Sequence, residues 1–290
     1  MKLVNQTVKL IPQEKSLNGI YKQIEIAART CYKSEDKITA DSAEEFVEKL
    51  IKRNHLAMLE HGTVYMFDDK EENDFWEIAN SPYSHVNTDT DGNYLTTNLR
   101  VVYELFPNNY KDIIKKFSCD ITPQHEIRYT VKCVTSIGIA RELCRHRVFS
   151  FAQESTRYCN YSKDDDIQFV IPNWAKLNPG KYVRDFIKDD DFDMYWMGDG
   201  YLVDCYSNTI ENKLLYSYEL SEDSYNSLIE KGLKPQDARE ILPLGTKTEI
   251  VMTGYKSQWT DFFDLRINGT TGKPHPDMKK LATLIKEEIK

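Results

Sequence analysis

The segment RHRVFSFAQESTRY, residues 145–158, is more informative about the fold and chemistry of this chain than any other stretch. It holds three arginines, one histidine and two serines close together in the sequence. Cationic groups at such spacing repel one another, so an anionic ligand is expected between them. Arginine binds phosphate or carboxylate through two parallel hydrogen bonds, and a serine hydroxyl adds a neutral donor. The segment therefore predicts a phosphate-binding site for a small charged ligand.

The rest of the chain makes this basic segment a local feature. The chain has 290 residues and a formal net charge of −8. Proteins that bind nucleic acid over a broad surface usually carry a basic face, so the acidic balance argues against that class. No apolar run reaches membrane-spanning length, and the first residues lack the core of a signal peptide. We expect a cytoplasmic protein without a membrane or nucleic-acid partner.

The cysteines do not form a recognisable framework. They lie at positions 31, 119, 133, 144, 159 and 205, without a CxxC pair. Such scattered thiols in a chain of this size are typical of reduced, packed side chains. His55 and His61 are six residues apart with no cysteine nearby, which is not a familiar metal-ligand spacing. We predict no metal site.

Periodicity and turn signals predict a mixed α/β fold in one domain spanning residues 1–290, with helices packed on a sheet. Strands are expected at 2–11, 62–67, 94–97, 127–135, 167–171 and 246–255. Helices are expected at 18–31, 42–51, 99–118, 136–147, 207–231, 235–240, 258–265 and 277–290. Ser42 to Glu45 has the pattern of a capping box, and Asp91-Gly92 that of a hairpin turn.

Several charged residues outside the serine-rich segment have two interpretations. Arg141 and Arg145 share a helix face, with Glu142 beside them as a charge partner or a ligand contact. A solvated helix end is the alternative for Arg141, because cations favour a helix C-terminus. Arg239 fits a surface ion pair better than a ligand contact, while Arg266, among aromatic residues, fits either. A lone histidine such as His55 is more often structural.

In the register Arg147, Ser150, Ser155, Arg157 and Tyr158, the segment resembles the signature of the flavin-dependent thymidylate synthases. Four further blocks fall in family order. These are Ala27-Ala28-Arg29, His55 with Glu60-His61, Asp237-Ala238-Arg239 with Leu242-Pro243-Leu244, and Asp264-Leu265-Arg266. The resemblance covers roughly residues 20–67, 127–172 and 233–290. Residues 68–126 and 173–206 are therefore expected to be insertions.

The resemblance implies a reaction and a set of site residues. The family transfers the methylene of 5,10-methylenetetrahydrofolate to C5 of deoxyuridylate (dUMP), giving dTMP and tetrahydrofolate, with FAD reduced by NADPH as hydride source. By resemblance, dUMP is bound by Glu142, Arg145, Gln153, Ser155, Thr156, Arg157, Arg239 and Arg266. FAD and folate are bound by His55, Arg145, His146, Arg147, Gln153 and Asp261. A homotetramer with shared sites is implied, with Arg239 reaching dUMP from a neighbouring subunit.

The implied chemistry agrees with the residues present. Methylating C5 needs electron density at that carbon, and a cysteine route would need an activated thiolate. No cysteine has such a context; Cys144, beside Arg145, is the nearest candidate. Arg266, at the position that polarises the uracil ring at N3, can instead stabilise the developing charge as a fixed cation.

The chain also departs from the family pattern. Ala152-Gln153 stands where Asn-Glu is common, and Glu142 stands where glutamine is common. Tyr255-Lys256-Ser257 replaces an Asn-x-Arg flavin segment, and Asp261 replaces an asparagine. These changes leave open a non-catalytic nucleotide-binding homologue. A single-stranded RNA binder is a third hypothesis, which the acidic balance disfavours.

Overall fold

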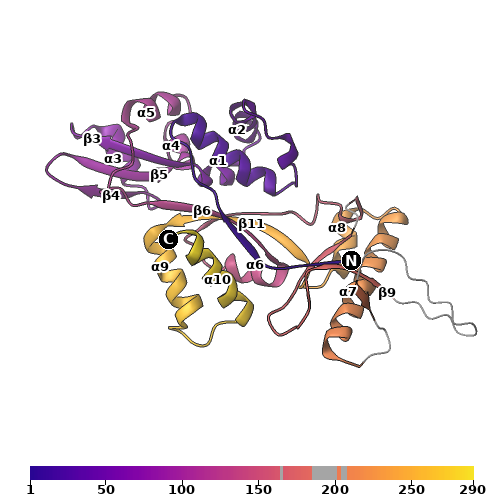
Figure 1. Ribbon diagram of the computed structural model, residues 1–290. Coiled ribbons are helices and arrows are strands. Elements are labelled where there is room, and N and C mark those ends of the chain that lie inside the picture. Colours follow the sequence, from indigo (N-terminus) through magenta and orange to yellow (C-terminus); the bar gives the residue numbers. More distant parts are fainter. Residues whose placement is uncertain (164–165, 185–200, 204–207) are drawn as a thin grey trace, which may run out of the picture.

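The structure, a computed structural model, describes residues 1–163, 166–184, 201–203 and 208–290. The described elements form three parts in a row (Figure 1). Each part contains one sheet and its own buried apolar cluster. The predicted mixed α/β class is confirmed, although the strands divide among three sheets.

The central part is built on an antiparallel sheet of order β2-β6-β11-β7. Its strands are β2 (Thr7–Leu10), β6 (Arg128–Ser136), β7 (Ser150–Gln153) and β11 (Lys247–Tyr255). Helices α6 (Ile137–Leu143), α9 (Lys256–Phe263) and α10 (Pro276–Glu288) contribute to the apolar cluster on one face. On the other face, Ala152 and Val251 pack with Ala27. Both faces of this sheet are therefore covered.

The N-terminal part surrounds a sheet of order β3-β5-β4. Its strands are β3 (Thr63–Asp68), β4 (His85–Thr88) and β5 (Asn93–Asn98). Its helices are α1 (Leu17–Thr30), α2 (Ser42–Lys52), the 3-10 helix η2 (Leu56–His61), α3 (Asn73–Ala79), α4 (Leu99–Leu105) and α5 (Tyr110–Phe117). The Asp91-Gly92 hairpin turn is confirmed, with Gly92 at a φ of 148° that only glycine adopts readily.

The third part joins the start of the chain to its later half. The sheet order is β10-β9-β1-β8. Its strands are β1 (Lys2–Val4), β8 (Gln168–Val170), β9 (Gly180–Arg184) and β10 (Tyr201–Val203). The long helix α7 (Ile210–Glu230) and the short α8 (Pro235–Ala238) complete it. Phe169 stacks on Tyr218, with ring centroids 4.4 Å apart, and fixes β8 against α7.

Four sequence-based predictions of local structure were wrong in detail. The strand predicted over residues 2–11 divides into β1 and β2, which belong to different sheets. The helix predicted over 99–118 breaks near Pro107, because proline disfavours a helical residue before it. The helix from 136 ends at Leu143, before the first signature arginine. Ser42 does not cap α2; its hydroxyl donates to Glu25 Oε2 at 2.9 Å.

The two segments expected to be insertions differ in how far the structure describes them. Residues 68–126 contain β4, β5 and three helices, and β5 is the direct partner of β3. Much of 173–206 lies outside the described residues. The insertion of both segments stays a prediction.

Candidate functional site

The first basic residues of the signature, Arg145 to Arg147, lie on the turn between α6 and β7. Ser136 Oγ caps α6 by accepting from Ile139 N at 3.3 Å, and the helix ends at Leu143. A run of tight main-chain turns then carries Arg145 and Arg147 to the surface. Within the described residues neither arginine forms an ion pair with the protein. Their positive charges are therefore available to an anionic ligand.

Arg266 joins two signature residues from the other side. It lies in the π-helical turn η5 (Asp264–Asn268), directly after α9. Its Nε donates to His146 Nε2 at 2.8 Å, and its NH1 group pairs with Glu142 Oε2 at 3.2 Å. We call Glu142, His146 and Arg266 the Arg266 cluster.

The Arg266 cluster requires a neutral histidine. Burial, and then the Arg266 charge, lower the pKa of His146 from its ordinary 6.5 to about 4. A neutral imidazole can accept through Nε2 and carries its proton on Nδ1. Only two of the five N–H groups of Arg266 are used in these contacts, and its side chain is 21% exposed. The others can reach a ligand.

A second cluster lies after β7. Arg239, in the 3-10 helix η4 (Arg239–Ile241), donates through NH1 to Thr156 Oγ1 at 3.0 Å. Ser155 Oγ accepts from Arg157 N at 3.4 Å, and Ser155 N donates to Cys31 O at 2.9 Å. The Arg157 guanidinium is exposed. We call Ser155, Thr156, Arg157 and Arg239 the Thr156 cluster.

Strand β7 separates the two clusters within the chain. At 3.3 Å per residue, its four residues span about 13 Å. Gln153, on this strand, donates through Nε2 to Thr248 Oγ1 of β11 at 3.3 Å. The structure thus joins Glu142 and His146 to Arg266, and Thr156 to Arg239, but it does not bring the two groups to one point in a single chain.

The role of Glu154 was not predicted from the sequence. Its fully buried carboxylate pairs with Lys247 Nζ at 3.2 Å and accepts from Glu249 N at 3.1 Å. This carboxylate holds the end of β7 on β11. It therefore does not take the place of the glutamate that is common in the family at the position of Gln153. Its position beside Gln153 is visible in the sequence, but its burial depends on Lys247, 93 residues away.

The other predicted residues stand apart from both clusters. His55 and Asp261 are exposed, and neither side chain forms a hydrogen bond or ion pair within the described part of the chain. His61 is fully buried and hydrogen-bonded through Nδ1 to Thr253 Oγ1 at 2.8 Å. Burial, with the nearby Arg128 charge, lowers its pKa to about 3. His61 is thus a neutral structural residue.

The described cysteines are free thiols without activation. Burial raises the pKa of Cys31, Cys119 and Cys159 to about 11, and that of Cys133 to about 12. The pKa of Cys144 is also raised by burial. Because the thiolate is the nucleophile, none of these five residues is prepared for attack on a pyrimidine.

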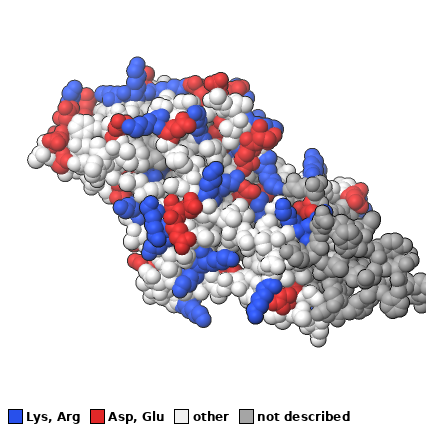
Figure 2. Space-filling view, in the orientation of Figure 1, with Lys and Arg blue, Asp and Glu red and all other residues white. Residues whose placement is uncertain are grey.

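The molecular surface carries both signs of charge. On the face shown in Figure 2, basic and acidic side chains are interspersed over the described residues. Arg145 and Arg147 of the signature differ from this mixed surface, because neither forms an ion pair within the described residues. Among the described helices, none has the length and apolar character needed to span a bilayer.

Comparison with known proteins gives a family match. Residues 93–290 match the family model described as thymidylate synthase complementing protein. A probable flavin-dependent thymidylate synthase of Paramecium bursaria Chlorella virus 1 is 32% identical over 152 residues, covering 51% of this chain and 61% of the relative. A flavin-dependent thymidylate synthase of Synechocystis is 26% identical, covering 54% of this chain and 64% of the relative. The matched region thus spans less than two thirds of either relative.

Among solved structures, a UMP/dUMP methylase from Streptomyces cacaoi, bound to 5-Br dUMP, is similar with a TM-score of 0.44 and 18% identity. The match covers 99% of this chain and 91% of that chain. A structural similarity at this level does not indicate the substrate of this chain.

Proposed function

The chain belongs to the thymidylate synthase complementing protein family, and we propose that it is a flavin-dependent thymidylate synthase. The proposed reaction converts dUMP to dTMP with 5,10-methylenetetrahydrofolate as methylene donor and NADPH as reductant, and releases tetrahydrofolate. The observation that carries the proposal is the set of exposed signature arginines without protein anions, flanked by two clusters of polar side chains.

The Thr156 cluster is proposed to bind the dUMP phosphate. The Arg157 guanidinium is exposed, and Arg239 uses only one N–H on Thr156. Hydroxyl and guanidinium donors on a short loop suit a phosphate, which accepts several hydrogen bonds at once.

The residues around Arg145 fit an anionic cofactor such as FAD. Arg145 and Arg147 offer unpaired guanidinium groups to a diphosphate, and neutral His146 keeps an N–H on Nδ1. Asp261 fits less well, because an exposed carboxylate would repel phosphates. When bound, reduced FAD supplies the hydride that completes the methyl group. Gln153 and His55 stay proposed contacts for cofactor or folate.

Arg266 is proposed to stabilise negative charge on the uracil ring. His146 and Glu142 fix the guanidinium through two contacts, so that the remaining N–H groups keep a set direction. Donors that are oriented before the reaction stabilise charge that develops in the transition state. The raised thiol pKa values of the described cysteines favour this route over a cysteine adduct.

A shared site in a homotetramer is proposed because one protomer separates its two clusters by the length of β7. Arg239 contacts Thr156 of its own chain, so the pair would enter a neighbour's site together. A cytoplasmic location stays a prediction from the sequence. The alternative, a non-catalytic nucleotide-binding homologue, is motivated by Gln153 and by Tyr255-Lys256-Ser257.

The test has two readouts on the purified protein. We expect a yellow protein with the visible absorbance of oxidised flavin, and formation of dTMP and tetrahydrofolate from dUMP, methylenetetrahydrofolate and NADPH. A yellow protein that binds dUMP but forms no dTMP would favour the non-catalytic homologue. A colourless protein that takes up no added FAD would remove the flavoenzyme proposal.

A further inference from the structure

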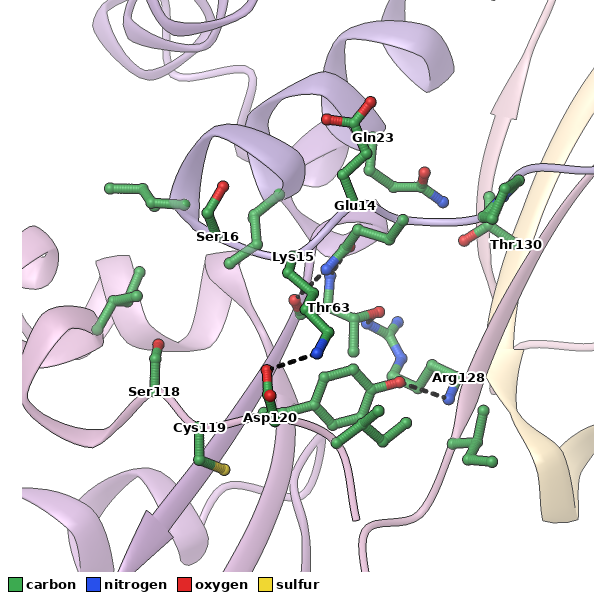
Figure 3. Close-up of a pocket in the computed structure, with 18 of the residues that line it drawn as sticks. Glu14, Lys15, Ser16, Gln23, Thr63, Ser118, Cys119, Asp120, Arg128 and Thr130 are labelled. Carbon is green, nitrogen blue, oxygen red and sulfur yellow. Dashed lines mark hydrogen bonds and ion pairs between the residues drawn. The ribbon is translucent and has the colours of Figure 1, made fainter. Parts of the chain in front are cut away.

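A cavity in the N-terminal part contains none of the signature residues. It has a volume of about 870 Å³ and opens between segment 10–17, α1, α5, β3 and the start of β6 (Figure 3). Small-molecule sites commonly measure about 300–1,000 Å³ and are largely apolar. The apolar lining includes Leu10, Ile11, Leu17, Ile20, Ile114, Ile121 and Ile127.

Arg128 brings an unbalanced charge to this cavity. Its NH1 group donates to Thr63 Oγ1 at 3.3 Å, and its NH2 group donates to Glu60 O at 3.0 Å. Its Nε is buried and has no hydrogen-bond partner. The Glu60 carboxylate is engaged with Arg100 at 2.7 Å. Within the described residues, Arg128 therefore has no carboxylate partner.

Arg128 is half-buried, and a cation that is partly removed from water without a paired anion is costly, because water solvates it less well. The Tyr255 ring, 5.3 Å from the guanidinium carbon, compensates only in part. Burial also lowers the pKa of Arg128. A ligand that places a negative charge in the cavity would compensate the guanidinium.

The rim of the cavity carries charges of both signs. Three lysines at the rim, Lys15, Lys111 and Lys115, are matched in number by Glu14, Asp112 and Asp120. Charges of both signs at the mouth do not favour a polyphosphate, which would need a basic rim. Only Arg128 inside remains to be neutralised.

The walls are fixed while the mouth can open. Gln13 exchanges two hydrogen bonds of 2.8 Å with the main chain of Thr63, which fastens segment 10–17 to β3. Across the mouth, Lys15 Nζ pairs with Asp120 Oδ1 at 2.9 Å, with side chains 76% and 73% exposed (Figure 3). Exposed pairs contribute little, so a ligand can separate this one at small cost.

We propose that the cavity binds a small organic acid that carries one carboxylate on an apolar body. The carboxylate pairs with Arg128, and the apolar body packs between Ile20 and Ile114. The binding is separate from the proposed thymidylate chemistry, since none of the Arg266 or Thr156 cluster residues lines the cavity.

Calorimetric titration with naphthaleneacetate and its neutral analogue naphthaleneacetamide tests the proposal on the full chain. We expect the acid to bind about ten-fold or more tightly than the amide, because a hydrogen bond to a charged group contributes about 1.5–3 kcal/mol. Arg128→Met should lower the affinity for the acid to that for the amide, and leave the amide unchanged. Arg53→Met, which replaces an exposed arginine outside the cavity, should change neither.

A blocking variant keeps the test decisive if Arg128→Met does not fold. Ser118 is exposed at the rim, so Ser118→Trp should fold and reduce the affinity for both compounds. Equal affinity of the unaltered protein for acid and amide, no binding of the acid, or unchanged binding in Ser118→Trp would each overturn the proposal. Because dTMP formation is not the readout, these results do not depend on the proposed enzyme activity.

Discussion

At the scale of single residues, the chain surrounds Arg266 with an acid and a neutral base. Glu142 Oε2 lies 3.2 Å from one end of the guanidinium, and His146 Nε2 lies 2.8 Å from its Nε. The histidine orients the arginine without adding charge, whereas the carboxylate offsets part of the positive charge. Nucleotide binding should therefore respond to the charge of residue 142 in a defined direction.

We predict that Glu142→Gln increases the affinity for dUMP about two- to five-fold, because removing a half-exposed ion pair changes the free energy by up to about 1 kcal/mol. The glutamine oxygen can still accept from Arg266, so the guanidinium keeps its direction. Calorimetric titration with dUMP measures the change. Glu104→Gln, whose carboxylate pairs with Arg100 elsewhere, is the matched control. Weaker binding of dUMP by Glu142→Gln would contradict the prediction.

Two buried histidines predict how stability depends on pH. The folded pKa values of His61 and His146 are lowered from 6.5 to about 3 and about 4. Below about pH 6.5 the unfolded chain therefore binds more protons than the folded chain, and the free energy of unfolding falls with acidification. The stabilisation is complete above that pH.

Urea unfolding between about pH 7 and pH 5 measures this dependence, in a range where most carboxylates stay ionised. His61→Asn keeps a side chain able to hydrogen-bond Thr253 but removes one titrating group, so its pH dependence should be shallower. A free energy of unfolding that stays constant or rises as the pH falls would show that these histidines are not held neutral.

At the scale of elements, the site depends on how β7 is held against β11. The strand has four residues; Glu142 and His146 of the Arg266 cluster precede it in the chain, and Thr156 follows it. The buried Glu154–Lys247 pair fixes its end, and Lys247 also contacts Glu249. This pair therefore positions Ser155 and Thr156, which follow directly in the chain.

We predict that Lys247→Met lowers the free energy of unfolding by about 3 kcal/mol, because it leaves the buried Glu154 carboxylate with only the more exposed Lys33, whose Nζ lies 3.6 Å away. The double variant Glu154→Gln/Lys247→Met should recover part of this loss. Lys111→Met, which breaks exposed pairs with Glu44 and Glu48, should cost under about 1 kcal/mol. Urea unfolding distinguishes these values, and equal losses in the two single lysine variants would contradict the assignment.

The sequence predicted those elements whose pattern is local. Alternation along residues 127–135 predicted β6, and Asp91-Gly92 predicted the hairpin, because both depend on neighbouring residues. The contacts between Arg266 and Glu142, 124 residues apart, and between Arg239 and Thr156, 83 apart, could not be predicted from spacing. Tertiary packing also redirected Ser42 from its expected cap to Glu25, since a hydroxyl binds the acceptor that the fold brings nearest.

At the scale of the whole molecule, two of the three parts share the N-terminal segment of the chain. Strand β1 belongs to the third sheet and β2 to the central one, so the first ten residues connect the two. The N-terminal sheet contains β5 from the segment expected to be an insertion, paired along the full length of β3. Phe75, Ile78 and Leu95 of that segment are fully buried.

We predict that replacing residues 69–124 by a short Gly-Ser linker prevents folding of the N-terminal part. The deletion removes the hydrogen-bonding partner of β3 and much of the surrounding apolar cluster. Circular dichroism during thermal unfolding should show no cooperative transition for this part. A variant that unfolds cooperatively and binds dUMP as the full chain does would show that the segment is dispensable.

In the proposed site the two clusters act on one pyrimidine nucleotide, one on its phosphate and one on its ring. Steady-state dTMP formation by Arg157→Ala and Arg266→Ala, with exposed Arg141→Ala as control, measures both contributions. We predict that Arg157→Ala raises the KM for dUMP about ten-fold or more, since hydrogen bonds to charged groups contribute about 1.5–3 kcal/mol. Arg266→Ala should abolish turnover while retaining measurable dUMP binding, and Arg141→Ala should resemble the unaltered protein. Undiminished turnover in Arg266→Ala, or an unchanged KM in Arg157→Ala, would contradict the account.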